Sequence, residues 1–205
     1  MSCSKYILTF FTCACLFLQV ESQSKQTEFN ILFIGNSLTY TNNLPLLVKQ
    51  QAKQHGVTVN TKMVAKPNYA ISDHWEEGDV QKLIASKVYH FVVIQQGPSS
   101  QQDGKQLLVE YGKKYSVLCK KSNAKLVYFM VWPPLNHPER FEGVINNHQY
   151  AAKINNAMLC PVGEVWKKHF RATNNYDYYE ADGFHPSKKG SEAAAKVITE
   201  YLFPK

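Results

Sequence analysis

Phe29-Asn30-Ile31-Leu32-Phe33-Ile34-Gly35-Asn36-Ser37-Leu38-Thr39 is the part of this 205-residue chain from which its fold class is first predicted. Four consecutive apolar residues, 31–34, predict a strand that is buried on both faces. A glycine ends the strand, and a helix is predicted over 44–54. Ser37 therefore lies in the turn at the carboxyl end of a buried strand, where open α/β sheets place their chemistry. The alternative is that Asn and Ser serve in this turn only as helix caps.

The same alternation of apolar strands and helices continues to the end of the chain. Further strands are expected over 57–64, 90–95, 125–131 and 160–162. Further helices are expected over 79–86, 101–121, 144–159 and 187–202, with a helical turn over 165–171 and an irregular stretch over 65–78. About five strand–helix units with near-continuous apolar strands predict a mostly parallel sheet that helices cover on both faces.

Length and composition fit one globular domain. Apolar residues make up 44% of the chain and charged residues 19%, which is usual for a globular protein and excludes a disordered one. The formal net charge is +7, but the lysines occur as scattered pairs on or beside predicted helices, which indicates solvated helix faces. No nucleic-acid recognition motif accompanies the charge, so we expect no nucleic-acid partner.

The first residues have the pattern of a targeting segment. Lys5 precedes an apolar stretch, 6–20, that is too short to span a membrane comfortably. Cleavage after Ser22 divides the chain into a signal peptide, 1–22, and a single domain, 23–205. The mature protein is then secreted or periplasmic, without stable membrane insertion. Lipid attachment at Cys13 or Cys15 and an uncleaved anchor are the alternatives.

Two cysteines remain in the predicted mature chain, Cys119 and Cys160. In an oxidising compartment they can form one disulfide, which we expect, and two buried free thiols are the alternative. No Cys or His spacing typical of a zinc site is present, so no metal site is expected.

The last loop carries the residues that change the interpretation of Ser37. It contains Asp182 and His185, three positions apart and directly before a helix. A serine hydroxyl is a poor nucleophile until a base takes its proton. Histidine is the usual base near neutral pH, and a carboxylate fixes its tautomer. With Ser37, the two residues supply nucleophile, orienting carboxylate and base.

These two motifs together resemble the SGNH (GDSL-type) hydrolase superfamily. Gly35-Asn36-Ser37-Leu38 follows the first strand, and Asp182-Gly183-Phe184-His185-Pro186 precedes the last helix. The resemblance is nearest the branch with GNS in place of GDS and spans about 30–202. It implies a flavodoxin-like three-layer αβα sandwich, with Ser37 as nucleophile, His185 as base and Asp182 as the residue that orients it. It also implies hydrolysis of carboxyl esters through an acyl-serine intermediate, without a cofactor.

The middle motifs of that family are altered in this chain. The family offers a glycine amide after the second strand and an asparagine side chain after the third, and with the serine amide they form the oxyanion hole. Here Pro67 has no amide hydrogen, so Asn68 is the candidate donor. Gln96 or Ser99 replaces the asparagine. Because one missing donor raises the barrier by about 3 kcal/mol, a weak enzyme and an inactive relative both stay open.

The expected substrate is a small acyl ester, with acetyl groups on carbohydrate as the example that the family suggests. The alternatives are a non-catalytic binding module and a thioesterase or lysophospholipase-like acyl hydrolase. Trp132 is interpreted either as a stacking platform for substrate or as core packing. His74 is expected to pack the loop beside the site, and His55, His137, His148 and His169 are expected to be solvated.

Overall fold

The structure is a computed structural model that describes Met1 and residues 28–204. Five parallel strands form one sheet in the order β2-β1-β3-β4-β5. The strands are β1 (Glu28–Gly35), β2 (Thr58–Ala65), β3 (Phe91–Ile94), β4 (Lys125–Phe129) and β5 (Met158–Cys160). This is the strand order of flavodoxin-like folds, and its switch point lies between β1 and β3. The predicted α/β class with about five parallel strands is confirmed.

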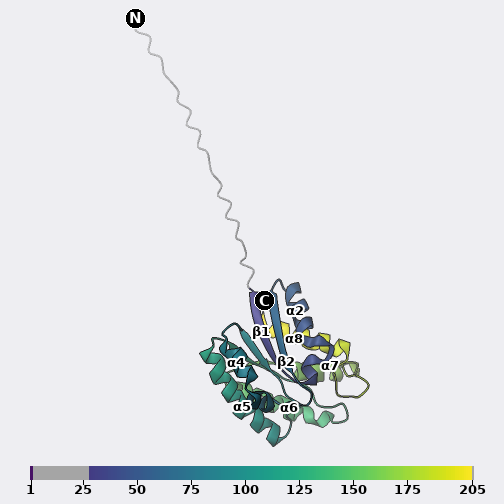
Figure 1. The fold of residues 1–205 in the computed structure, drawn as a ribbon. Coiled ribbons are helices and arrows are strands. Elements are labelled where there is room, and N and C mark those ends of the chain that lie inside the picture. The colour runs from purple at the N-terminus through teal and green to yellow at the C-terminus, as the bar shows by residue number, and fades with distance from the viewer. Residues whose placement is uncertain (2–27, 205) are drawn as a thin grey trace.

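Helices cover both faces of the sheet (Figure 1). One face carries α2 (Leu44–Gln54), α7 (Val162–Thr173) and α8 (Lys188–Leu202). The other face carries α3 (Ile71–Glu77), α4 (Asp79–Ala85), α5 (Gln102–Lys121) and α6 (Phe141–Ile154). Residues of β1 alternate between the two cores: Ile31 and Phe33 join the first, and Leu32 and Ile34 join the second. The three-layer sandwich follows directly from this alternation.

Several elements have other bounds than expected: α6 begins and ends earlier than 144–159, and α7 is longer than the helical turn expected over 165–171. Two further differences concern α3 and β5. The stretch expected to be irregular contains α3, whose first residue, Ile71, is fully buried, and the Asp73 carboxylate accepts the Ala70 N–H at its start. The last strand is 158–160 instead of 160–162, because α6 ends at Ile154 and Asn156 takes a left-handed backbone with φ of 48°. The second difference depends on where a helix stops, which apolar periodicity alone does not fix.

The expected disulfide is wrong. Cys119 packs in the core between the sheet and α5, whereas Cys160 packs in the core on the opposite face. Both are buried free thiols, and the sheet separates them. Burial raises the pKa of the Cys119 thiol to about 12 and raises the pKa of Cys160 as well, so both stay protonated and unreactive.

One of the histidines expected to be solvated is buried. His148 lies on α6 with 1% of its surface exposed, and its Nδ1 atom is 2.8 Å from the Val144 carbonyl oxygen. The helix turns this position inward because it shares a face with the buried Val144 and Ala152. Desolvation lowers the pKa of His148 to about 4.

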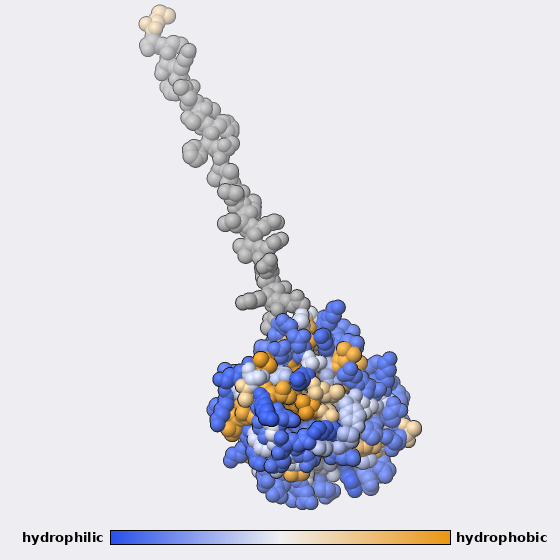
Figure 2. All heavy atoms as spheres, in the orientation of Figure 1, coloured by the Kyte–Doolittle hydropathy of each residue, from blue (hydrophilic) through white to orange (hydrophobic). Residues whose placement is uncertain are grey.

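The surface drawn in Figure 2 is mostly hydrophilic, with apolar residues gathered in smaller patches. Lys113 and Lys114 on α5 are exposed as expected, whereas the Lys167 side chain is largely covered and pairs with Glu142. Within residues 28–204, no helix is long and apolar enough to cross a membrane. Apart from Met1, the predicted leader over 1–22 lies outside the described residues, so its cleavage stays a prediction.

Candidate active site

Ser37 begins a one-turn helix, α1 (Ser37–Tyr40), directly after β1. Asn36 is its N-cap, and the Asn36 Oδ1 atom accepts the Leu38 N–H at 3.1 Å. The capping function therefore belongs to Asn36, and the Ser37 hydroxyl stays available for another partner. Because β1 lies at the switch point of the sheet, this hydroxyl is placed where open α/β folds bind ligands.

The last loop brings His185 and Asp182 to this hydroxyl. The His185 Nε2 atom lies 3.0 Å from Ser37 Oγ, and the His185 Nδ1 atom lies 2.6 Å from Asp182 Oδ2. The other carboxylate oxygen accepts the backbone N–H groups of Phe184 and His185, at 2.9 Å each. The hydrogen bond from His185, followed by that from Phe184 N–H, lowers the pKa of Asp182. An ionised Asp182 keeps the ring proton on Nδ1, so Nε2 accepts the proton of the Ser37 hydroxyl.

Gln95, which directly follows β3, binds the turn in which Ser37 lies. Its Oε1 atom accepts Asn36 N–H at 2.9 Å and Thr39 Oγ1–H at 2.7 Å, and its Nε2 atom donates to Asn36 Oδ1 at 3.0 Å. All of these groups are buried. A Cβ atom on Gly35 would lie 2.4 Å from both Gln95 Oε1 and Thr39 Oγ1, so only glycine fits where the strand ends.

His74, on α3, supports the same turn through a hydrogen bond to the end of β1. Its ring is 1% exposed, and its Nε2 atom donates to the Gly35 carbonyl oxygen at 2.7 Å. Burial lowers the pKa of His74, so the ring is neutral near neutral pH. The expected structural role is confirmed. In the described residues, no group of three or more His, Cys, Asp or Glu is arranged to hold a metal ion.

The loop after β2 reaches the Ser37 turn through Asn36. The Asn36 Nδ2 atom donates to the Tyr69 carbonyl oxygen at 2.9 Å, which an aspartate could not do. Asn68 precedes it with a left-handed backbone, φ of 61°, as a glycine would adopt. Asn68 is exposed, and its N–H has no acceptor among residues 28–204, nor has the N–H of Ser37. The two amides are therefore free to bind a ligand.

Gln96 and Ser99, the candidates that follow β3, are buried and bound to each other. The Gln96 Nε2 atom donates to Ser99 Oγ at 2.8 Å and to the Gly104 carbonyl at 3.3 Å, and Ser99 Oγ donates to the Gly97 carbonyl at 3.0 Å. Their side-chain donors thus stabilise the loop between β3 and α5.

Trp132 belongs to the core and not to a substrate platform. It is fully buried and stacks on Trp166, with ring centroids 3.5 Å apart. Its Nε1–H donates to the Phe184 carbonyl oxygen at 3.0 Å. Trp132 therefore ties the loop that carries Asp182 and His185 to the end of β4.

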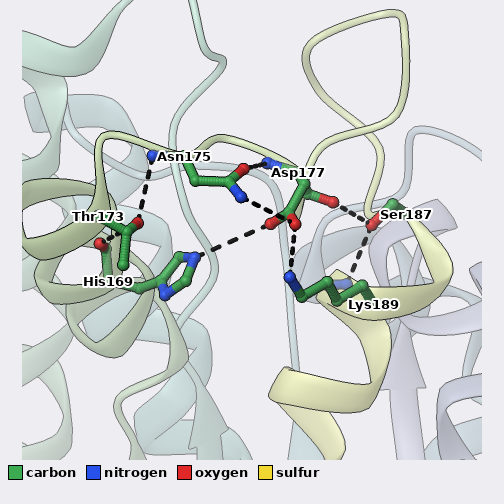
Figure 3. A network of polar contacts seen from close by, with 7 residues as sticks. His169, Thr173, Asn175, Asp177, Ser187 and Lys189 are labelled. Atoms are coloured by element: carbon green, nitrogen blue, oxygen red, sulfur yellow. Dashed lines mark hydrogen bonds and ion pairs between the residues drawn. The ribbon is translucent and has the colours of Figure 1, made fainter.

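A polar cluster fixes the start of the same loop (Figure 3). Lys189 of α8 and Asn175 both donate to the Asp177 carboxylate, and the lysine lowers the pKa of Asp177. Ser187 donates from Oγ to the Asp177 carbonyl at 2.6 Å and accepts the Gly190 N–H. The loop over 177–187 is thus closed at its base, which limits where Asp182 and His185 can move.

Sequence reasoning predicted Ser37, Asp182 and His185, which the structure brings together, but it missed Gln95 and the bond from Trp132 to the loop. Gln95 stands at the end of a buried strand, beside a second glutamine. An amide at the end of an otherwise apolar strand is a signal for a buried hydrogen-bond network.

The chain matches no family model and no curated protein, but its fold is similar to solved structures. A protein from Slackia heliotrinireducens described as an SGNH hydrolase is 24% identical with a TM-score of 0.73, covering 86% of this chain and 100% of that one. A lipase/acylhydrolase from Enterococcus faecalis is 17% identical, with a TM-score of 0.68 and coverage of 85% and 95%. A catalytic mutant of an acetylxylan esterase from Geobacillus stearothermophilus is 15% identical, with a TM-score of 0.64 and coverage of 86% and 95%. The chain has the fold of the SGNH and GDSL-type hydrolases.

Proposed function

We propose that this protein is a serine hydrolase of the SGNH type that cleaves carboxyl esters. One observation carries the proposal: a continuous chain of hydrogen bonds runs from Ser37 Oγ through the His185 ring to the Asp182 carboxylate. This arrangement of nucleophile, base and orienting carboxylate is the one that activates a serine hydroxyl on several unrelated folds. The similarity to esterases and acylhydrolases of the same fold supports the same reaction class.

The reaction follows from the geometry. Ser37 Oγ attacks the carbonyl carbon of the ester while its proton passes to His185 Nε2, which gives a tetrahedral intermediate. Collapse breaks the bond to the alcohol oxygen, which takes the proton from Nε2, and an acyl-serine stays behind. Water then attacks with the help of the same ring, releases the acid and restores Ser37. Asp182 keeps the Nδ1 proton in place throughout.

The negative oxygen of the intermediate needs hydrogen-bond donors. We assign this role to the backbone N–H groups of Ser37 and Asn68, because neither has an acceptor among the described residues. Gln96 and Ser99 are the candidates for a third donor from the sequence, but their side-chain hydrogens bind Ser99 Oγ and the Gly104 and Gly97 carbonyls in the loop after β3. A donor that is missing raises the barrier by about 3 kcal/mol, so this site is expected to work more slowly than one with three donors.

We propose a small acyl group, such as acetyl on a carbohydrate, as the substrate class. The similarity to an acetylxylan esterase supports this choice, and the similarity to a lipase/acylhydrolase supports the alternative of a longer acyl chain. A series of aryl esters from acetate to octanoate separates the two. An acyl-chain enzyme gains about 0.8 kcal/mol of binding for each methylene that it buries, whereas a small-acyl esterase loses activity beyond the first members.

The proposed nucleophile is tested with Ser37→Ala and with Ser86→Ala as a matched control, because Ser86 is an exposed serine whose hydroxyl donates to the nearby Leu83 carbonyl. Ser37→Ala is expected to abolish turnover of 4-nitrophenyl acetate and labelling by a fluorophosphonate, with an unchanged circular-dichroism spectrum. Ser86→Ala is expected to keep both. Full turnover by Ser37→Ala would overturn the proposed mechanism.

A binding module without activity is the second candidate. The engagement of Gln96 and Ser99 with each other favours it, because the third oxyanion donor is then absent. A folded wild-type protein that neither turns over aryl acetates nor reacts with the fluorophosphonate would support the binding module over the enzyme.

We also propose export, which the charged start and the apolar stretch over 6–20 support. N-terminal sequencing of the protein from the medium or periplasm tests it. A mature chain that begins after Ser22 is expected, and a chain that keeps Met1 or carries lipid on Cys13 or Cys15 would favour an anchor.

A further inference from the structure

Two asparagines follow the helical turn of Ser37, and both have an unusual backbone. Asn42 and Asn43 take left-handed conformations, with φ of 55° and 52°, and both are exposed. Outside glycine, such conformations cost free energy and persist where surrounding contacts fix them. Asparagine adopts such conformations more readily than most residues. The two asparagines therefore form a turn of defined backbone conformation between α1 and α2.

Only the first of the two asparagines makes a hydrogen bond to a distant part of the described chain. The Asn42 Nδ2 atom donates to the Pro186 carbonyl oxygen and to Ser191 Oγ, each at 3.0 Å. These partners lie 144 and 149 positions further along the chain. The Asn43 side chain makes no such bond within residues 28–204. Two neighbouring asparagines, both with a left-handed backbone, therefore differ in whether the side chain binds the segment that carries His185.

The partners of Asn42 belong to the segment that carries the base. Pro186 directly follows His185, and Ser191 lies in the first turn of α8. The path from Ser37 along the chain to Asn42, across to Pro186, back to His185 and across to Ser37 Oγ forms a closed ring. Of the four links, two are covalent backbone and two are hydrogen bonds. Without the Asn42 link, the base segment keeps its bonds to Trp132 and to the Glu180 N–H, but it loses its hydrogen bonds to the residues that follow the Ser37 helix.

We propose that Asn42 is a positioning residue that holds His185 against Ser37. The inference rests on the proposed function, because it assigns Asn42 a role only if these two residues react. Asn42 does not bind the substrate or take part in proton transfer. One N–H of its amide binds the Pro186 carbonyl, directly after the base, and the other binds Ser191 Oγ in the first turn of α8. A carboxylate in its place would face the Pro186 carbonyl with no proton to donate.

The packing of α2 on α8 connects the same two parts of the chain independently of Asn42. Buried residues of both helices share one core, so the fold does not depend on two hydrogen bonds at the surface. A variant at this position is therefore expected to fold, and its effect should appear in the reaction.

The test compares Asn42→Gly with Asn43→Gly in the full chain. Glycine adopts a left-handed backbone without strain, so both variants keep the turn, and only Asn42→Gly removes hydrogen bonds to the base segment. We expect kcat for 4-nitrophenyl acetate to fall about 10- to 100-fold in Asn42→Gly, the scale that misplaced reacting groups produce. KM should change less than twofold. The rate of fluorophosphonate labelling should fall with kcat, and Asn43→Gly should leave all three values unchanged.

A second pair, Asn42→Asp and Asn43→Asp, keeps the side-chain size and decides the matter if the first variant does not fold. Asn42→Asp is expected to lose kcat to the same degree or more, and Asn43→Asp is not. Unchanged kcat in both Asn42 variants, with Ser37→Ala inactive, would overturn the positioning role and leave the proposed function standing. Full activity of Ser37→Ala would instead show that the proposed function had failed.

Discussion

The Nε2 atom of His185 lies 3.0 Å from the Oγ atom of Ser37, although 148 positions separate the two residues in the chain. Each residue is held by its own set of contacts. Gln95 and His74 fix the turn of Ser37 from the sheet and from α3, and Trp132 fixes the loop of His185 from the end of β4. The short distance is thus the result of two rigid supports that meet at the carboxyl edge of the sheet.

Asp182→Asn is expected to lower kcat by about a thousandfold or more. An amide at this position donates to Nδ1 where the carboxylate accepts from it, so the ring proton moves to Nε2 and the ring can no longer accept the Ser37 proton. Kinetics with 4-nitrophenyl acetate measure the loss. KM and the melting temperature serve as controls and should change little, because half of the Asp182 side chain is exposed. Retention of a tenth or more of the wild-type kcat would contradict the assigned role.

Asn36→Asp is expected to lower activity, in contrast to the matched variant Asn155→Asp. Both asparagines are buried, and both donate from Nδ2 to a backbone carbonyl: Asn36 to Tyr69 and Asn155 to Val109. Each substitution sets a carboxylate against a carbonyl and should reduce the free energy of unfolding by about 1–3 kcal/mol. Only Asn36 joins the Ser37 turn to the loop of Asn68, so kcat should fall about tenfold or more in that variant alone.

Urea unfolding and ester kinetics, measured on the two asparagine variants side by side, separate the two effects. An equal loss of kcat in both variants would mean that reduced stability, and not the position of the Asn68 amide, is responsible.

Trp132→Phe and Trp166→Phe form a second matched pair. Either change weakens the stack of the two rings, which contributes about 0.5–1.5 kcal/mol beyond the buried area. Trp132→Phe also leaves the Phe184 carbonyl without its indole donor, whereas the Trp166 Nε1–H has no partner in the described residues to lose. We expect kcat to fall severalfold only in Trp132→Phe, because its partner lies next to His185 in the chain. Thermal unfolding should show both variants destabilised, and a normal kcat in Trp132→Phe would exclude this anchor.

The parts of the fold that are local in sequence were predictable. The apolar run 31–34 indicates a buried strand because it is short, rich in residues that favour strands and ended by Gly35. The spacing of Asp182 and His185 before a helix is equally local, since one turn closes the contact between them. The proximity of Asp182 and His185 to Ser37 was expected because the carboxyl ends of the strands in a parallel sheet lie at the same edge.

The parts that depend on the opposite faces of the sheet were not predictable from the sequence. Cys119 and Cys160 each lie at an apolar position, but nothing local tells which face each position joins. The supports of the site have the same origin. Gln95, Asn42 and Trp132 find their partners across 50 or more positions, and those distances come only from the packed layers. Short polar motifs in the sequence thus predict which residues form a site, whereas the residues that position them are known only from the tertiary structure.

His148 makes the stability of the fold depend on pH in a predictable direction. Its pKa is lowered from 6.5 to about 4 because burial disfavours the charged ring, so below pH 6.5 the unfolded chain binds a proton that the folded chain does not. The free energy of unfolding should therefore fall as the pH drops from 6.5 toward 4, by up to about 3 kcal/mol from this residue. His74, whose pKa is also lowered by burial, acts in the same direction.

Urea unfolding of the wild type and of His148→Leu at several pH values between 7 and 4.5 tests this dependence on His148. The variant removes one proton-binding site of the unfolded chain, so its free energy of unfolding should fall less steeply with acid than that of the wild type. His137→Gln is the control. The His137 side chain is 41% exposed, so it keeps more of its contact with water in the folded state than the buried His148 does. Equal slopes for the wild type and His148→Leu would mean that the buried ring accepts a proton in the folded state, and the α6 core would then need a partner for that charge.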